Sequence, residues 1–449
     1  HGARRGPVPR LFGRALTASV GYDSAMRMRR LVPGVMLAGL AFVATAAPAR
    51  AQVAFEQVTR DLANPDAGAR LNAVRLLKDA AYPEAAAPLA ALITDPVDQV
   101  QVEAMAAELN IFLVEKVTSR KRVALVVEVR NRVGADAAFS AGPLAIGAQR
   151  VPPAVLVALR SALRDESPLV AVTAAYTLGT LGVQASGAER RDLLAALAPE
   201  LAAMTGSPDA ARRYVAVRVA GRLFAPRVGD GPVDTALGDA VILALNDDEK
   251  GVRLEAMHAL GALRYERAVQ ALSELFQYYG RGDLGDAALD AVARIGHATG
   301  VPTLTAQLSA RSAALRGIAV EGLARTGDKA HLPAIEAAVQ GERDAALALT
   351  ATFARVALGT GAMDGVIDAL SQPKLREQAR GYLVHLAPTH AAQLTRVAQD
   401  PDATRRADLA DIAALAADPR LQSVVETLLK DPDARVRTAA GRAQLRLSR

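Results

Sequence analysis

The chain has 449 residues, of which 51% are apolar, 22% charged and 4% aromatic, and it contains neither Cys nor Trp. Half of this length is apolar and charges of both signs are interspersed, which excludes a disordered protein and indicates several domains or an array of repeats. The absence of Cys excludes disulfides, thiolate metal ligands and a Cys nucleophile.

The net charge of +6 is unevenly distributed along the chain. Residues 1–51 hold eight Arg and a single acidic residue, Asp23, so the remaining chain carries 45 basic and 46 acidic residues. A nearly neutral chain with few aromatic side chains lacks the basic surface that nucleic-acid binding requires. We therefore expect no nucleic-acid partner.

Residues 26–51 have the three parts of a bacterial export signal. A short basic stretch after Met26 is followed by the apolar run 31–47 and then by Ala49 and Ala51, the small residues that a signal peptidase accepts. This pattern predicts cleavage after Ala51 and a periplasmic or secreted protein. Two alternatives stay open: an uncleaved membrane anchor, and twin-arginine export through Arg29 and Arg30.

The sequence gives separate expectations for the segments before and after the signal. Residues 1–25 precede Met26 and are expected to be unstructured. After residue 51 no apolar run reaches the roughly 20 residues that cross a bilayer, so no membrane span is expected once the signal is cleaved.

The remaining chain contains an internal repeat, a turn followed by an amphipathic helix. Six turn markers begin at positions 64, 95, 165, 207, 247 and 431, and each is followed nine residues later by Ala. Asp or Asn in the marker is expected to cap the helix start, and the Ala to lie where neighbouring helices approach closely. The six alanines are Ala73, Ala104, Ala174, Ala216, Ala256 and Ala440.

Each unit is predicted to be a pair of helices. Val252, Ala256 and Leu260 lie on one helical face, and the preceding segment shows the same spacing at Leu237 and Val241. The pattern Asp-Pro-Asp-x-x-Val-Arg-x-x-Ala-Ala, as in residues 431–440, resembles the second helix of a HEAT repeat of the bacterial, phycobilisome-lyase-like type. The resemblance implies an all-α solenoid of stacked antiparallel helix pairs.

Marker spacings of 31, 42 and 40 residues predict about ten repeats. Residues 52–115 are expected to hold the N-terminal repeats and residues 151–449 the others, degenerate between 267 and 420. In that degenerate stretch we expect helices over 286–295, 312–325, 343–356 and 374–386.

Arg follows the marker by six residues in several units, for example at Arg253 and Arg437. We expect this Arg to bond the acidic residue of a neighbouring unit, with Asp247–Arg253 and Asp431–Arg437 as the expected pairs. The alternative is a series of ligand-binding arginines.

An insertion is predicted at residues 116–150, where the marker spacing rises to 70 residues. Its Gly and Pro content indicates a loop over the array, although Val123–Val129 could instead pair as a strand within the core. The insertion contains a basic cluster that is either a solvated face or a binding site for an anionic partner. The cluster consists of Lys116, Arg120, Lys121, Arg122, Arg130 and Arg132.

Other motifs give no catalytic or metal site. The G-x-G-x-x-G over Gly280–Gly285 follows a helical pattern rather than a strand, so it is interpreted as a turn between helices. Iron-binding enzymes on the HEAT scaffold resemble this chain in helix pairing, and that resemblance implies a metal site built from His-Glu pairs on facing helices. None of the histidines here is followed by Glu, so no such site is expected. No cofactor is expected, and no nucleophile or phosphate-loop motif is present.

The sequence therefore predicts a non-catalytic scaffold of the cell envelope that binds protein partners on its concave face of second helices. The alternative, drawn from the resemblance, is a lyase-like enzyme or enzyme accessory that holds a small molecule in the groove of the solenoid.

Overall fold

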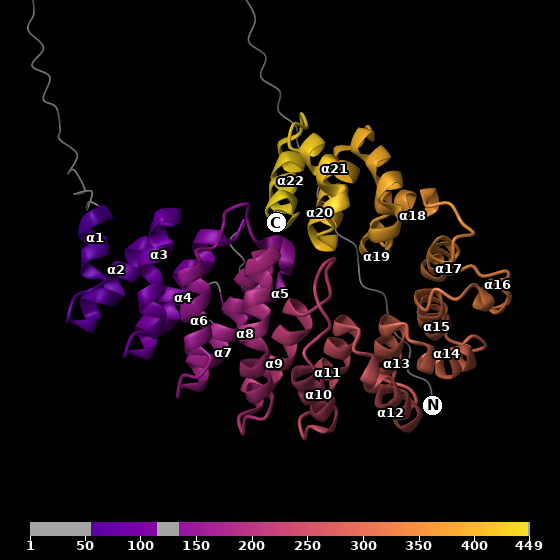
Figure 1. The fold of residues 1–449 in the computed structure, drawn as a ribbon, viewed down its shortest axis with the longest axis horizontal. Helices are drawn as coiled ribbons and strands as arrows, with labels where there is room; N and C mark the ends of the chain where they lie inside the picture. The colour runs from indigo at the N-terminus through magenta and orange to yellow at the C-terminus, as the bar shows by residue number, and fades with distance from the viewer. Residues whose placement is uncertain (1–54, 115–133, 448–449) are drawn as a thin grey trace, which may run out of the picture. The chain divides into compact units, whose positions relative to one another are not determined.

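The fold is a stack of helix pairs, seen in a computed structural model that describes residues 55–114 and 134–447. Helices pack chiefly on their neighbours in sequence, so that the array runs from α1 to α22 (Figure 1). The segments predicted as an upstream stretch and a signal peptide lie outside the described residues. In the described part no helix has the length and apolar content needed to cross a bilayer.

The second helices of the pairs form a continuous row in which consecutive members pack together. They are α2 (Ala67–Ala80), α4 (Asp98–Phe112), α7 (Pro168–Leu181), α9 (Ala210–Leu223), α11 (Lys250–Leu263), α13 (Asp283–Ile295), α15 (Ala313–Arg325), α17 (Ala345–Ala357), α19 (Arg376–Leu394), α20 (Ala403–Ala416) and α22 (Ala434–Leu447).

Most of the first helices are shorter than the second helices, with α8 as an exception, and several are extended by 3-10 turns. They are α1 (Phe55–Asp61), α3 (Ala86–Leu89), α6 (Pro153–Ala162), α8 (Gly187–Thr205), α10 (Thr235–Leu243), α12 (Val269–Tyr279), α14 (Val301–Gln307), α16 (Leu332–Val339), α18 (Asp364–Asp368) and α21 (Gln422–Leu428). The 3-10 turns are η1 (Pro83–Ala85), η2 (Ala90–Thr94), η3 (Pro143–Ala145), η4 (Gly182–Gln184), η5 (Ala244–Asn246), η6 (Glu266–Ala268), η7 (Ala298–Gly300), η8 (Lys329–His331), η9 (Ala369–Ser371), η10 (Thr395–Gln399) and η11 (Pro419–Leu421).

The prediction of an all-α solenoid of helix pairs is confirmed. The described residues contain eleven second helices where about ten repeats were expected, and only an isolated β-bridge between Leu113 and Ile146. In the degenerate stretch, α13, α15, α17 and α19 overlap the four predicted helices. These helices form without the turn marker because their apolar spacing alone gives a face to bury.

The sequence predicts that the Asp or Asn of each turn marker caps the helix, but the structure gives the first and third marker residues different roles. The first marker residue stabilises the turn: the Asp247 carboxylate accepts from the amide of Glu249 at 2.9 Å. Where the third marker residue is Asp it caps the helix, as where Asp209 accepts from the amide of Arg212 at 2.8 Å. Val97, Ser167 and Glu249 in the same position make no such side-chain bond. Each helix begins three residues after the first residue of its marker.

The six repeat alanines are all buried, with at most 2% of their surface exposed. Close packing of the second helices also depends on glycine. A Cβ added at Gly221 on α9 would lie 2.9 Å from Cα of Ala259 on α11, and one at Gly261 would lie 3.0 Å from Cα of Ala291 on α13. Small residues therefore set the distance between consecutive units.

The prediction of an insertion that lies loosely over the array is wrong for residues 134–150, while 115–133 and the whole basic cluster lie outside the described residues. Helix α5 (Ala135–Ser140) packs on α7, and Phe139 is only 2% exposed. Ile146 is 1% exposed, and the amide of Gly147 donates to the carbonyl of Phe112 at 2.8 Å. This segment is part of the core, so its deletion would remove packing as well as a loop.

The last helix of the array also contacts this segment. Arg446 of α22 is 5% exposed and donates to the backbone carbonyls of Pro143 and Ala414. Burial, together with the nearby charge of Arg442, lowers the pKa of Arg446 to about 10. The inserted segment thus joins units that are far apart in sequence.

Candidate binding site

The most regular polar feature of the array is an Arg–Asp pair that links consecutive units, which we call a rung. In the rung between α9 and α11, Nε of Arg213 donates to Oδ2 of Asp247 at 2.6 Å and Nη2 donates to Oδ1 at 2.9 Å. Nη1 donates to the carbonyls of Ser207 and Pro208, at 3.1 and 3.0 Å, in the turn of its own unit. The guanidinium thus holds two turns together.

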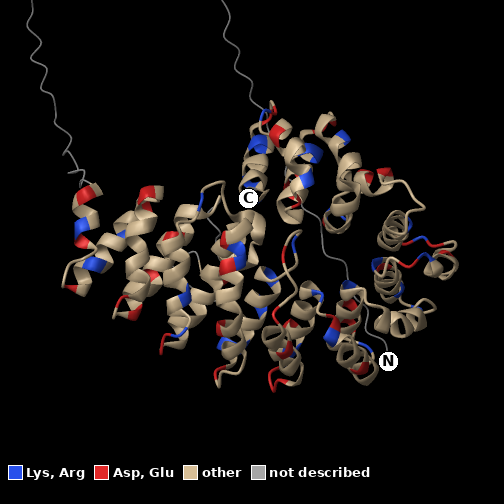
Figure 2. Cartoon of the chain, viewed as in Figure 1, with Lys and Arg blue, Asp and Glu red and all other residues tan. Residues whose placement is uncertain are grey.

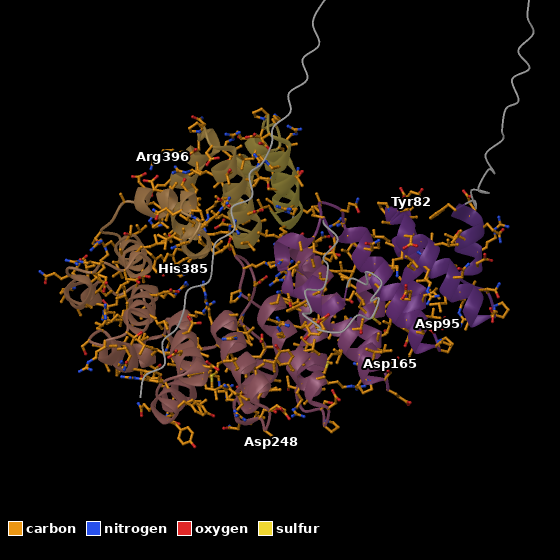
Figure 3. All side chains as sticks on the ribbon, turned by 180° about the vertical axis from the view of Figure 1, so that it is seen from behind. Tyr82, Asp95, Asp165, Asp248, His385 and Arg396 are labelled. Carbon is orange, nitrogen blue, oxygen red and sulfur yellow. The ribbon has the colours of Figure 1, made fainter. Side chains whose placement is uncertain are left out.

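The same geometry recurs elsewhere in the array. Arg70 and Arg406 make the same bidentate contact with Asp95 and Asp431, with Nε to Oδ2 distances of 2.6 Å in both pairs. Arg316 pairs in the same position with Glu342. Asp95 and Asp165 lie with Asp248 along one edge of the array in Figure 3, and Figure 2 shows acidic residues gathered at the turns.

The rungs explain the pKa shifts of their members. Hydrogen bonding from Arg213 holds the pKa of the Asp247 carboxyl below its usual range, and the bond to Asp247 raises the pKa of Arg213. Asp431 is shifted in the same direction, first by its bond to Arg406. In these two rungs the bonds from arginine outweigh the opposing effect of burial and stabilise the ionised forms of Asp247 and Asp431.

The two expected pairs within one unit are wrong. Arg253 contacts Asp247 only through the backbone carbonyl, and Arg437 contacts Asp431 in the same way. The carboxylates are instead taken by Arg213 and Arg406 of the preceding units. The general expectation of a bond to the neighbouring unit holds, but the partner lies one unit earlier.

The series of rungs is interrupted between α11 and α15. Gly280 occupies the position where the unit of α13 should supply its Asp, so Arg253 faces no carboxylate. One unit further, Asp286 stands in the Arg position and Ala310 in the Asp position. Two consecutive rungs are therefore missing.

A groove of about 620 Å³ lies at this interruption. Phe276, Leu315 and Ile318 provide its apolar surface, and Arg281 and Arg311 are exposed beside it. The guanidinium groups of these two arginines have no hydrogen bond or ion pair with the described residues. The other lining residues are Gln277, Gly280, Gly282, Asp286, Gln307, Ala310, Ser312 and Ala314.

The G-x-G-x-x-G motif forms one wall of this groove. Gly280 and Gly282 have φ values of 64° and 107°, which side chains other than that of Gly rarely adopt, and they connect α12 to α13. A Cβ at Gly285 would lie 2.2 Å from the carbonyl oxygen of Gly280. The motif is thus a tight turn between helices, and the helix before it replaces the strand of a dinucleotide site.

The histidines do not come together in a metal site. No group of three or more metal-ligating side chains occurs within residues 55–114 and 134–447. Nδ1 of His385 lies 2.8 Å from Nη1 of Arg325 and 3.2 Å from Nη2 of Arg264, and burial with these cations lowers the pKa of His385 to about 3. A neutral His385 accepting from arginine cross-links α19 to α15 and α11, inside the array (Figure 3).

Comparison with known proteins gives limited likeness. No protein-family model matches the chain, and no curated protein matches it. A solved engineered protein from the Northeast Structural Genomics Consortium is 17% identical, with a TM-score of 0.41, and the match covers 88% of this chain and 99% of that one. The complex of CpcE and CpcF of phycocyanin lyase from Nostoc sp. PCC7120 is 19% identical, with a TM-score of 0.39, covering 55% of this chain and 94% of that one.

Proposed function

We propose that the chain is a non-catalytic scaffold of the cell envelope that binds a protein partner in the groove between α12, α13 and α15. The observation that carries this proposal is the groove itself: about 620 Å³ of space with apolar and cationic walls, at a place where two consecutive rungs are missing. Apolar surface beside unpaired charge is typical of a binding surface.

The chemistry of the lining residues supports binding rather than catalysis. The ionisable groups of the groove are two arginines and Asp286, and no His or Lys lies among the lining residues that could exchange a proton near neutral pH. The volume is also within the range of small-molecule sites. The lyase-like alternative therefore stays a prediction, in which the groove would hold a small molecule.

A capture experiment with envelope extract tests the scaffold function. Ala314 is exposed at the second residue of α15 and lines the groove, so Ala314→Trp should fill it and abolish capture of the partner. Ala211 is exposed at the equivalent position of α9, and Ala211→Trp is the matched control. Equal capture of the same protein by both variants would place its binding site elsewhere.

The envelope location is tested separately by N-terminal sequencing of the protein from fractionated cells. A mature chain beginning at Gln52 in the periplasm or medium would support export with cleavage after Ala51. Recovery of the uncleaved chain from the cytoplasmic fraction would contradict it.

A further inference from the structure

The filled rungs define where a carboxylate binds in this array. In each, Nη1 of the Arg is fixed by two carbonyls of its own turn, which orients Nε and Nη2 toward the next unit. The carboxylate then accepts from both nitrogens and from the amide two residues after its own, as Asp247 does from Glu249 and Asp431 from Asp433, each at 2.9 Å. A carboxylate in this position thus has three donors.

Arg253 is oriented in the same way but has no carboxylate. Nη1 donates to the carbonyls of Asp247 and Asp248 at 2.5 and 3.0 Å, the same bonds that Arg213 makes in its turn. Nε is shielded from solvent and has no hydrogen-bond partner among the described residues. An unsatisfied donor in this position is unfavourable, and an incoming carboxylate would relieve it.

No side chain on the adjoining turn takes the role of the missing Asp. Gly280 has no side chain, and a Cβ added there would meet no atom within 4 Å. Asp283 is the nearest acid in sequence on α13, but its carboxylate already lies 2.9 Å from Nζ of Lys250. The amide of Gly282 corresponds to the third donor of a filled rung. Gly280 and Gly282 line the groove, whereas Arg253 itself does not.

We propose that the interruption of the rungs binds an acidic segment of a protein partner, with an Asp or Glu side chain of that segment completing the rung with Arg253. This inference rests on the proposed function and specifies the partner. Arg281 and Arg311 attract further carboxylates of the same segment, and Phe276, Leu315 and Ile318 receive an apolar residue beside them. The partner thus supplies the carboxylate that, in the filled rungs, comes from the next unit of the chain itself.

The groove favours an acidic peptide over a nucleic acid. Its apolar surface suits a side chain of a polypeptide, and Asp286 within the groove would repel a continuous phosphate backbone. A single carboxylate, by contrast, can be placed against Arg253 as it is in the filled rungs. The occupant is therefore expected to carry separated acidic residues with apolar neighbours.

The test uses fluorescence anisotropy of the full chain with two labelled peptides, Leu-Asp-Pro-Asp-Leu and its counterpart with Asn in place of both Asp. The Asp peptide should bind about tenfold more tightly than the Asn peptide at low salt, as expected for one charge-assisted bidentate contact. Its affinity should fall as salt is raised from 50 to 300 mM. Equal affinity for the two peptides would overturn the proposal.

Variants at Arg253 locate the contact. Arg253→Gln should weaken the Asp peptide about tenfold and leave the Asn peptide unchanged, and Arg253→Lys, which keeps the charge without the bidentate geometry, should lose most of the same discrimination. Arg437→Gln is the matched control, because Arg437 makes the same two carbonyl bonds in the turn before α22, which does not line the groove. Undiminished binding by a folded Arg253→Gln, or an equal loss in Arg437→Gln, would overturn the site.

Two further outcomes distinguish other occupants and the underlying function. Tighter binding of a 12-nucleotide single strand than of the Asp peptide would show a polyanion site, and self-association lost in Arg253→Gln would show that a second copy of the chain fills the groove; either would overturn the proposal. If Ala314→Trp abolishes partner capture while Arg253→Gln leaves it intact, the scaffold function stands and only the acidic partner is rejected.

Discussion

Helix α11 lies between a filled rung and an unfilled one, which differ in whether Asp or Gly stands opposite the arginine. On the side of α9, Asp247 pairs with Arg213, and on the side of α13, Arg253 faces Gly280. Both arginines bond the same two carbonyls of their own turns, so these bonds alone are enough to hold the guanidinium in place. The acidic residue adds a link between units. Where it is absent, the arginine can bind a carboxylate of another molecule instead.

The largest difference between the two arrangements should be in stability. Arg213→Gln leaves the Asp247 carboxylate, 7% exposed, without its bidentate partner. We expect this change to lower the free energy of opening of α9 and α11 by about 2 kcal/mol, because a nearly buried charge loses its counter-ion. Hydrogen exchange of the α9 and α11 amides measures the effect, and protection equal to that of the unsubstituted chain would mean that the rung contributes nothing.

A smaller cost is expected at the glycine that interrupts the series. Gly280 has φ of 64°, whereas Asp247 occupies the corresponding position with φ of −61°. Gly280→Ala should destabilise α12 and α13 by about 1–2 kcal/mol because Ala is strained at positive φ. A matched Gly231→Ala change lies in open space at negative φ and should have little effect on urea unfolding followed by circular dichroism.

Arg253→Gln should have a still smaller effect on the isolated chain. It removes two bonds to backbone carbonyls, one part-buried and one exposed, but leaves no carboxylate unpaired, so we expect a loss of about 0.5–1 kcal/mol. Urea unfolding of this variant and of Arg213→Gln, measured side by side, gives the decisive comparison. Equal losses in the two variants would show that the carbonyl bonds, rather than the Asp, account for the stability of a rung.

The helical array could be predicted from sequence because its signals are local. Capping residues and apolar spacing lie within one helix, so helices such as α15 and α17 could be found even where the marker is lost. The partner of each Arg could not, because Asp247 is 34 residues from Arg213 but only six from Arg253, and the shorter distance along the chain was misleading. Which of the two a side chain reaches depends on how successive units stack.

The groove and the inserted segment were missed for a similar reason. Gly280 reads as an ordinary turn residue, and only comparison with the filled rungs reveals what it lacks. Phe139 stands among Gly and Pro residues that predict a loop, yet it packs beneath Arg222, whose guanidinium carbon lies 3.4 Å from the ring centroid. Such contacts join helices far apart in sequence, so no local pattern indicates them.

The smallest expected effect is a difference in acid response between the two arrangements. The pKa of Asp247 in the folded chain lies below that of an unfolded chain, mainly because of its bond to Arg213. The stability contributed by this carboxylate is therefore fully present above the unfolded pKa of about 4 and is lost as pH falls through the lower folded pKa. Protection of α9 and α11 should decline in that range in 0.3 M salt, which screens the exposed Lys250–Asp283 pair. Helix α13 has Gly280 in the Asp position and Asp286 in the Arg position, so it takes part in no rung and should lack that contribution. Arg213→Gln should flatten the decline at α9 and α11, and a decline of the same size in that variant would assign the acid response to groups outside the rung.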